Sequence, residues 1–316
     1  MEKVIFLEEI FFEKMWGSTN LANFYKDKYT QKAMPLGEVW GFSGHRNGVN
    51  KIRSGIYNGK NLNWLWKNHP EIFGEHATSQ TDYFPIQIRL VDALKKLSIQ
   101  VHPNDEYARK YANDNGKNEC WYVLSAAENA KIIYGHNAMS EGELRENLQQ
   151  NKIEESLNYL PVKTGDFIFV PTGTMHAIGD DIFLIEVAEC SDTTYRFYDY
   201  NRIDQEGNKR ELHLQESLEV LQIPQTYPKL EEKIVFIKNG YQQQYLDDEA
   251  FTVEYIHVQG ESEVQKNFAY YACYLISGGG EVAGEKVKQG DFFLITNAVK
   301  TFAIKGTMEL FVTYKK

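Results

Sequence analysis

The chain has 316 residues, of which 42% are hydrophobic and 14% aromatic, so it is long enough for one large domain or two ordinary ones with a dense core. Its charged fraction of 25% is close to the globular average, which argues against disorder. The net charge of −10 argues against nucleic acid and anionic membranes as main partners, although a local basic pocket could still bind a phosphorylated small molecule.

The chain shows no targeting signal. Residues 1–12 mix apolar side chains with charged ones, unlike the uninterrupted apolar stretch of a signal peptide, and no apolar run approaches the length of a membrane span. The cysteines at 120, 190 and 273 are scattered and form no CxxC pair, which suggests neither a disulfide framework nor a thiolate zinc site. The sequence therefore predicts a cytoplasmic protein.

The predicted elements alternate between strands and short helices, and the abundance of Tyr and Phe favours β structure. The predicted strands lie at 37–44, 85–92, 97–102, 121–124 and 131–134. The predicted helices lie at 63–73, 103–112, 140–158 and 211–222. After Pro224 and Pro228 the chain is β-rich to its end, which predicts two domains, 1–230 and 231–316.

A segment in the middle of the chain is echoed near its end. Gly165–Val170 reads Gly-Asp-Phe followed by apolar residues and then His176, and Gly290–Ile295 repeats this pattern before Phe302. The second copy is one residue longer and carries a Phe where the first carries a His. Two related β barrels, the second without a metal site, would explain the echo; a chance match of two short strands is the alternative.

The spacing of Gly165, Pro171, Gly173 and His176 resembles the second motif of the cupin superfamily. A buried strand would end at the Pro and Gly, whose tight turn returns the chain to the barrel with the His aimed inward. A barrel mouth is a natural place for a small ligand.

The first cupin motif usually supplies a His-x-His pair and a later Glu. Gln100 and His102 stand two apart on a predicted strand and so share one face, and Glu119 follows after a loop. With His176 they offer imidazole, carboxylate and amide groups, which suit zinc. A single His is more often an ordinary core or surface residue, so the prediction of one zinc ion per chain depends on both motifs occurring together.

Four segments resemble type I mannose-6-phosphate isomerase in its short bacterial form. Ser98–Pro103 matches the family's Ser-Ile-Gln-x-His-Pro, and Lys14–Gly17 matches its Lys-x-Trp-Gly. Tyr111–Glu119 resembles its Tyr-x-Asp-x-Asn-His-Lys-Pro-Glu signature, and His176–Arg196 resembles its second signature. The departures in the Tyr111–Glu119 segment are Asn113, Gly116 and Asn118.

The resemblance implies a mainly β fold of two cupin-like jelly-roll barrels with a small helical insertion. It implies a catalytic domain over 1–230 and a C-terminal domain over 231–316 that lacks metal ligands. The activity implied is interconversion of mannose 6-phosphate and fructose 6-phosphate through an enediol. The residues implied by register are, for catalysis, Arg196 and Glu186, and, for binding of the sugar phosphate, Lys117 and Ser98.

Two other functions fit parts of the pattern. A cupin oxygenase would hold iron or copper with open positions for oxygen, but a neutral substrate would not need the matched pair Lys117 and Arg196. A non-catalytic sugar-phosphate-binding cupin is disfavoured by the complete ligand set. Exposed Lys and Arg are more often solvated surface charge, and Glu186 could merely orient a ligand. The sequence does not predict the oligomeric state.

Overall fold

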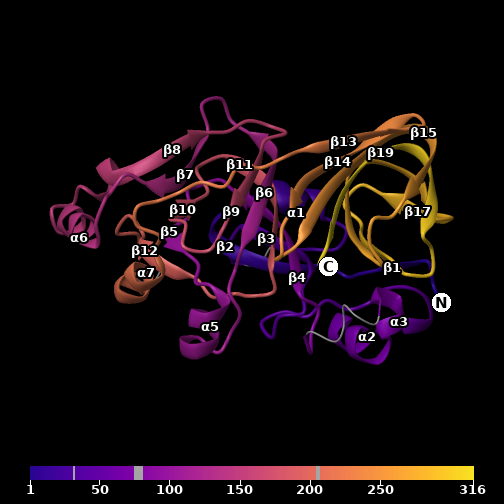
Figure 1. Cartoon of the computed structure of the whole chain (residues 1–316), viewed down its shortest axis with the longest axis horizontal. Coiled ribbons are helices and arrows are strands. Elements are labelled where there is room, and N and C mark those ends of the chain that lie inside the picture. Colours follow the sequence, from indigo (N-terminus) through magenta and orange to yellow (C-terminus); the bar gives the residue numbers. More distant parts are fainter. Residues whose placement is uncertain (31–32, 75–80, 204–206) are drawn as a thin grey trace. The chain divides into compact units, whose positions relative to one another are not determined.

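The computed structural model divides the chain into two compact units. Residues 31–32, 75–80 and 204–206 lie outside the described residues. Phe11–Val39 and Arg89–Pro228 form the middle unit, whereas Met1–Ile10, Trp40–Ile88 and Lys229–Lys316 form the terminal unit. Strands dominate both units (Figure 1), which confirms the mainly β prediction. No helix in the described part of the chain is long and apolar enough to cross a membrane.

Two sheets lie wholly or largely in the middle unit. One has the strand order β12 (Tyr195–Tyr198), β5 (Ile99–Val101), β10 (His176–Ala177), β7 (Lys131–His136) and β8 (Leu157–Pro161). The other has the order β2 (Ile10–Ser18), β3 (Leu36–Phe42), β4 (Ile86–Ala93), β11 (Ile182–Glu189), β6 (Glu119–Ala126) and β9 (Phe167–Val170). The short helices are α1 (Asn20–Phe24), α5 (Asp105–Tyr111), α6 (Glu141–Gln149), η2 (Ile153–Ser156) and α7 (Leu214–Val220).

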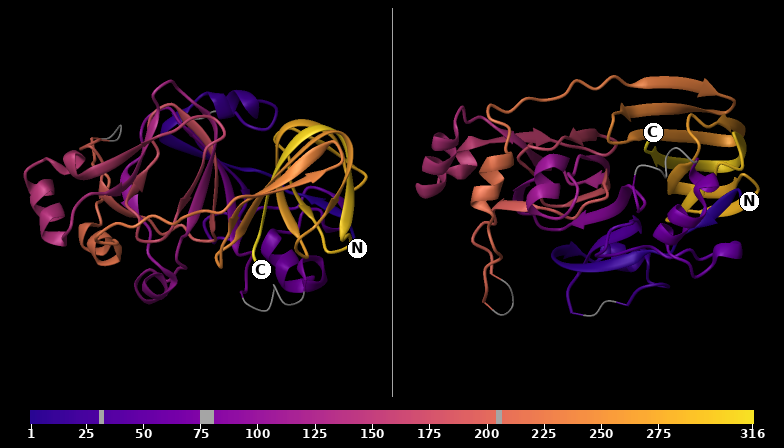
Figure 2. Two further views of the ribbon diagram at one scale, coloured as in Figure 1. Left: turned by 45° about the horizontal axis from the view of Figure 1, so that its top comes forward. Right: turned by 60° about the horizontal axis from the view of Figure 1, so that its bottom comes forward.

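The terminal unit is built on one eight-stranded sheet, whose long strands curve around a common interior (Figure 2). The strand order is β1 (Val4–Phe6), β18 (Phe292–Ile295), β16 (Tyr271–Val282), β19 (Thr301–Tyr314), β15 (Thr252–Gln265), β14 (Gly240–Asp247) and β13 (Lys233–Ile237), with β17 (Glu285–Lys288) paired to β16. The helical segments are η1 (Gly55–Tyr57), α2 (Leu62–Asn68) and α3 (Pro70–Phe73).

An apolar cluster between the two sheets holds the middle unit together. Trp121 and Leu184 of the six-stranded sheet belong to the same buried cluster as Ile132 of the five-stranded sheet. Burial of apolar surface contributes roughly 25 cal/mol per Å², so this layer is a main source of stability. The candidate ligands enter the same layer.

Strand alternation separates the two faces of β5. Ile99 and Val101 lie in a second apolar cluster, which Leu218 of α7 shares, so these two side chains face the helices. Because successive side chains of a strand point to opposite faces, Gln100 and the following His102 face the six-stranded sheet. The alternation read from the sequence therefore places both polar residues inside the unit.

The predicted helix over 140–158 is shorter than expected. Its start is as predicted, because the Ser140 side chain accepts a hydrogen bond from the backbone N–H of Glu143. The helix ends at Gln149, and Asn151 has a φ of 57°, a left-handed conformation that asparagine tolerates and a helix cannot continue through. The rest of the predicted range forms η2 and the start of β8.

Two other predicted helices coincide at their centres with helices of the structure. The helix expected over 103–112 is α5, and Asn104 caps it by accepting from the N–H of Tyr107 at 3.0 Å. The helix expected over 211–222 is α7, which begins and ends inside that range. The helix expected over 63–73 is divided into α2 and α3, because His69 leaves the helical conformation before Pro70.

The echoed Gly-Asp-Phe segments form the same turn. Gly165 and Gly290 have φ values of 90° and 89°, in the left-handed region that glycine adopts without strain. Asp166 accepts from the N–H of Lys163 at 2.8 Å, and Asp291 accepts from the N–H of Lys288 at 2.9 Å. This agreement in detail favours the interpretation as related barrels over a chance match.

The division into units is discontinuous along the chain. The last break, after Pro228, lies next to the boundary expected near residue 230. The segments Met1–Ile10 and Trp40–Ile88 belong to the terminal unit rather than to the rest of 1–230. β1 pairs with β18, and a bridge between Leu7 and Ile52 joins the second segment to the first. The catalytic role of one domain and the missing ligands of the other stay predictions.

Candidate metal centre

Two buried histidines of the middle unit turn their Nε2 atoms toward each other. Nδ1 of His102 lies 2.9 Å from the carbonyl oxygen of Thr193, and Nδ1 of His176 lies 2.9 Å from that of Thr174. Because a carbonyl oxygen only accepts, each Nδ1 donates its proton and each Nε2 keeps a lone pair. Burial, reinforced by the charge of Lys117, lowers the pKa of His102 to about 4, and burial also lowers the pKa of His176.

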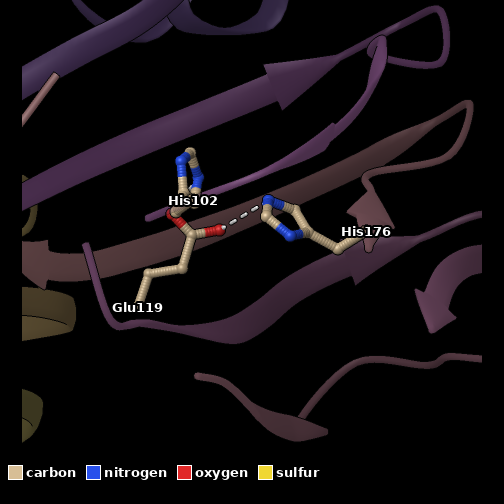
Figure 3. Close-up of side chains that lie close together, drawn as sticks. All are labelled: His102, Glu119 and His176. Carbon is tan, nitrogen blue, oxygen red and sulfur yellow. Dashed lines mark ion pairs between the residues drawn. The ribbon is translucent and has the colours of Figure 1, made fainter. Parts of the chain in front are cut away.

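Glu119 completes this cluster from the opposite sheet (Figure 3). Its Oε2 lies 3.3 Å from Nε2 of His102, and its Oε1 lies 3.4 Å from Nε2 of His176. Among the described residues, Oε1 and the Nε2 of His102 have no hydrogen-bond partner. One ligand atom from each residue lies within 4.8 Å of the others. Lone pairs facing a carboxylate at this distance repel one another unless a cation lies between them, so the residues fit a divalent metal.

Gln100 reaches the same cluster. It pairs with His176 across β5 and β10, and its Nε2 lies 3.3 Å from Nε2 of that histidine. The oxygen and nitrogen of an amide are assigned from their neighbours, and the flipped amide would present its oxygen to the same point. The structure therefore brings all four predicted ligands together; their binding of a metal stays a prediction.

Lys117 lies beside the cluster and is only 3% exposed. Its Nζ donates to Oε2 of Glu119 at 2.6 Å and to Oε1 of Glu186 at 3.2 Å. Burial works to lower the pKa of Lys117, but the two carboxylates outweigh it and raise the pKa. Burial likewise works to raise the pKa of Glu119, which the charge of Lys117 and the contact with His102 hold well below its usual range.

Glu186 has the opposite shift. Burial raises its pKa, and the charge of Glu119 adds to this, while Lys117 and Arg89 oppose it. A buried carboxyl with a raised pKa next to a fixed ammonium is a candidate for proton transfer. The two carboxyls of the site are thus pushed toward different protonation states.

Arg89 is a site residue that the sequence reasoning missed. Its guanidinium is 6% exposed, lies 3.7 Å from Glu186 and donates to Asp192 at 3.1 Å and to the carbonyl of Ser191 at 3.3 Å. The sequence did contain a sign of this role, because Arg89 is a charged residue among apolar neighbours in the middle of the predicted strand over 85–92. A buried charge in such a strand requires partners, and these come from a segment about a hundred residues away.

Arg196 and Ser98 are not joined to the metal cluster by any bond among the described residues. Arg196 pairs with Gln100 across β12 and β5, so both side chains leave the same face of the sheet. Its Nη1 donates to the carbonyl of Glu211 at 2.7 Å, and its buried Nε has no partner in the described chain. Ser98 is buried just before β5. The guanidinium thus keeps one donor that no described residue satisfies.

Two β barrels, one with a buried cluster of two histidines and a glutamate, define a cupin-type protein. Two family models match the chain, "Phosphomannose isomerase type I, catalytic domain" over residues 5–159 and "Mannose-6-phosphate isomerase, cupin domain" over residues 241–315. The chain is 37% identical to mannose-6-phosphate isomerase ManA of Bacillus subtilis (strain 168), over 98% of each chain. It is 35% identical to mannose-6-phosphate isomerase of Streptococcus mutans, over 99% of each chain.

Solved structures agree with this relationship. The crystal structure of mannose 6-phosphate isomerase from Bacillus subtilis superposes with a TM-score of 0.93 at 35% identity, covering 99% of this chain and 100% of that one. A putative mannosephosphate isomerase from Archaeoglobus fulgidus, at 21% identity and a TM-score of 0.76, shares the fold. The chain belongs to the type I mannose-6-phosphate isomerase family and is an aldose–ketose isomerase. The family, fold class and enzyme class predicted from the sequence are confirmed.

Proposed function

We propose that the chain interconverts mannose 6-phosphate and fructose 6-phosphate through an enediol, using one zinc ion held by Gln100, His102, Glu119 and His176. The convergence of two imidazole lone pairs on one carboxylate carries the proposal, because a cation between these groups would stabilise the arrangement. The names of the full-length relatives supply the substrate. We place the reaction in the cytoplasm, as the sequence predicts.

Nitrogen and oxygen donors next to titratable groups suit a catalytic zinc. When bound, such an ion supplies Lewis-acid polarisation of the sugar oxygens and lowers the cost of enediolate charge. The protein itself fixes the orientation of the ligand side chains. Thr193 and Thr174 do so through their carbonyl oxygens, which hold His102 and His176 in the tautomer that presents Nε2.

Aldose–ketose exchange requires a group that moves a proton between C1 and C2. Glu186 is suited to this role, since burial raises its pKa and Lys117 lies 3.2 Å from it. Lys117, bonded to Glu119 as well, keeps a positive charge next to the atoms where enediolate charge would develop. Nη1 of Arg89 lies 3.7 Å from the same oxygen, Oε1, that accepts from Lys117, so a second cation helps to hold this carboxyl in place.

The phosphate needs a cation that is not already neutralised. Lys117 is enclosed by two carboxylates, which makes it a poorer phosphate ligand than the sequence suggested. Arg196 is half-buried and has a donor without a partner in the described chain, so we assign the dianion to its guanidinium. Ser98 would add a hydroxyl donor.

A coupled assay on mannose 6-phosphate tests the proposal. We expect turnover that a chelator abolishes and zinc restores, with mannose itself a far poorer substrate. Turnover of the phosphorylated sugar in a verified metal-free preparation would defeat the metal assignment. No turnover by the zinc-loaded protein would defeat the reaction itself.

A further inference from the structure

The edge strand of the terminal unit is apolar and exposed. β13 stands at the end of the sheet order, and no other described strand pairs with its outer edge. Ile234, Val235 and Phe236 are 51%, 60% and 83% exposed. An exposed apolar edge offers free backbone N–H and C=O groups together with side chains that gain by leaving water, which is the template for pairing with another strand.

The hairpin between β13 and β14 determines which residues face that edge. Its two-residue turn is closed by the pair Ile237 and Gly240, which in such a hairpin exchange both backbone hydrogen bonds. Bonding alternates along an antiparallel pair, so Val235 also bonds to β14, while Ile234 and Phe236 turn their N–H and C=O groups outward. In any added antiparallel strand, an outward residue must oppose another outward residue.

We propose that β13 pairs with β13 of a second copy of this chain, antiparallel, with the twofold axis at Val235. In this register Ile234 opposes Phe236 of the second copy, and Glu232 opposes Lys238, each combination occurring twice. Placing the axis at Ile234 would set Glu232 against Phe236, and placing it at Phe236 would set Lys238 against Ile234. The charge pattern at the two ends of the strand therefore selects one register.

The interface is small. β13 has five residues, so the paired strands bury less than the roughly 1,200–2,000 Å² of a standard stable interface. The dimer is therefore reversible and depends on concentration. The edge lies wholly within the terminal unit and uses none of the candidate site residues, so association is independent of the isomerase reaction.

Sedimentation velocity over a concentration series tests the pairing. The wild type should pass from monomer to dimer as its concentration rises. Val235→Lys places two like charges directly opposite each other at the axis and should keep the protein monomeric. Ile56→Lys, at a residue that is 77% exposed outside β13, is the matched control and should dimerise like the wild type. Circular dichroism checks that both variants are folded. A wild type that stays monomeric up to its solubility limit, or a dimer that Val235→Lys leaves intact, would overturn the proposal.

Two further variants test the register. Glu232→Lys alone should weaken the dimer, and adding Lys238→Glu should restore it, because the two charges exchange places. Val235→Cys should form a disulfide-linked dimer on mild oxidation, since directly opposed residues at a non-hydrogen-bonded position have Cα atoms about 4.5 Å apart. The three native cysteines are buried, so the introduced thiol is the reactive one. Absence of this link, or of the charge-swap rescue, would refute the register.

Discussion

Nε2 of His102 lies 3.3 Å from Oε2 of Glu119, although the proton of this imidazole is already donated at Nδ1 to the carbonyl of Thr193. The contact therefore brings a lone pair against a carboxylate inside a buried layer. Such a pair gains stability from a cation held between the two groups, whereas the low pKa of the buried imidazole means that an added proton destabilises the fold. Metal removal and acidification should both act on this contact.

Loss of one histidine ligand should remove the metal. We expect His176→Ala to lose bound zinc and at least ~10²-fold in kcat, because the remaining donors hold a catalytic ion poorly. Elemental analysis alongside the coupled assay measures both. His257→Ala, on β15 of the terminal unit, is the control and should keep metal and activity. A His176→Ala protein with a full complement of zinc would contradict the ligand assignment.

The stability of the metal-free protein should fall with acidification. Burial lowers the folded-state pKa of His102 to about 4, below its ordinary value, so between these values the unfolded chain binds more protons. Stability is then complete above about pH 6.5 and is lost as the pH falls toward 4, by roughly 1.4 kcal/mol per pKa unit. Urea titrations of the metal-free protein at several pH values measure this slope.

His102→Gln isolates that contribution. The glutamine does not titrate, so the variant should lose less stability than the wild type between pH 6.5 and 4. The lowered pKa values of Glu119 and His176 also make stability fall as the pH falls. The plot of stability against pH should therefore be less steep in His102→Gln than in the wild type, but not flat. An identical slope in both proteins would show that His102 does not titrate with folding.

Arg196 should matter for turnover but not for metal content. Removing a charge-assisted contact to the phosphate typically costs a few kcal/mol, so Arg196→Ala should lower kcat/KM about 10²-fold or more. Arg196→Lys should recover only part of this, since an ammonium lacks the planar two-pronged donor. Arg109→Ala, on exposed α5, is the control. Near-normal kcat/KM in Arg196→Ala would defeat the phosphate assignment.

The terminal unit should carry no zinc of its own. Tyr271 pairs with Ile295 five residues after Gly290, as Glu119 pairs with Val170 five residues after Gly165, so an aromatic stands in the ligand's place. We expect one ion per chain by metal counting. A second tightly bound ion that survives His176→Ala would contradict this.

Tyr271 should instead support the fold. Its hydroxyl donates at 3.0 Å to the buried carboxylate of Glu254, which also accepts from Tyr314 at 2.8 Å. Tyr271→Phe should therefore destabilise the protein by about 1–3 kcal/mol without changing its metal content. Tyr111→Phe, at an exposed position, is the control for denaturant unfolding. Unchanged stability would show that the remaining donors suffice for Glu254.

The parts of the site set by local spacing were predictable. Gln100 and His102 share a face because strand alternation has a fixed period, and His176 follows a turn whose Pro and Gly mark it. Arg89 was not predicted, since its partner Asp192 is distant in sequence and only the pairing of strands brings them together. The discontinuous units escaped prediction for the same reason, because β1 joins β18 across almost the whole chain.

The turns at Gly165 and Gly290 fold alike, yet the barrel interior beside the first holds two histidines and a glutamate, whereas the interior beside the second holds one carboxylate, Glu254, bonded by tyrosine hydroxyls. In each turn the aspartate accepts a hydrogen bond from the backbone N–H three residues before it, a contact that does not depend on what fills the interior. The residues that shape the turn are thus different from the residues that line the barrel interior. Interior positions can therefore change by substitution while the turn keeps its conformation. In this way one of two related barrels can lose a metal centre and keep an interior that only stabilises the fold.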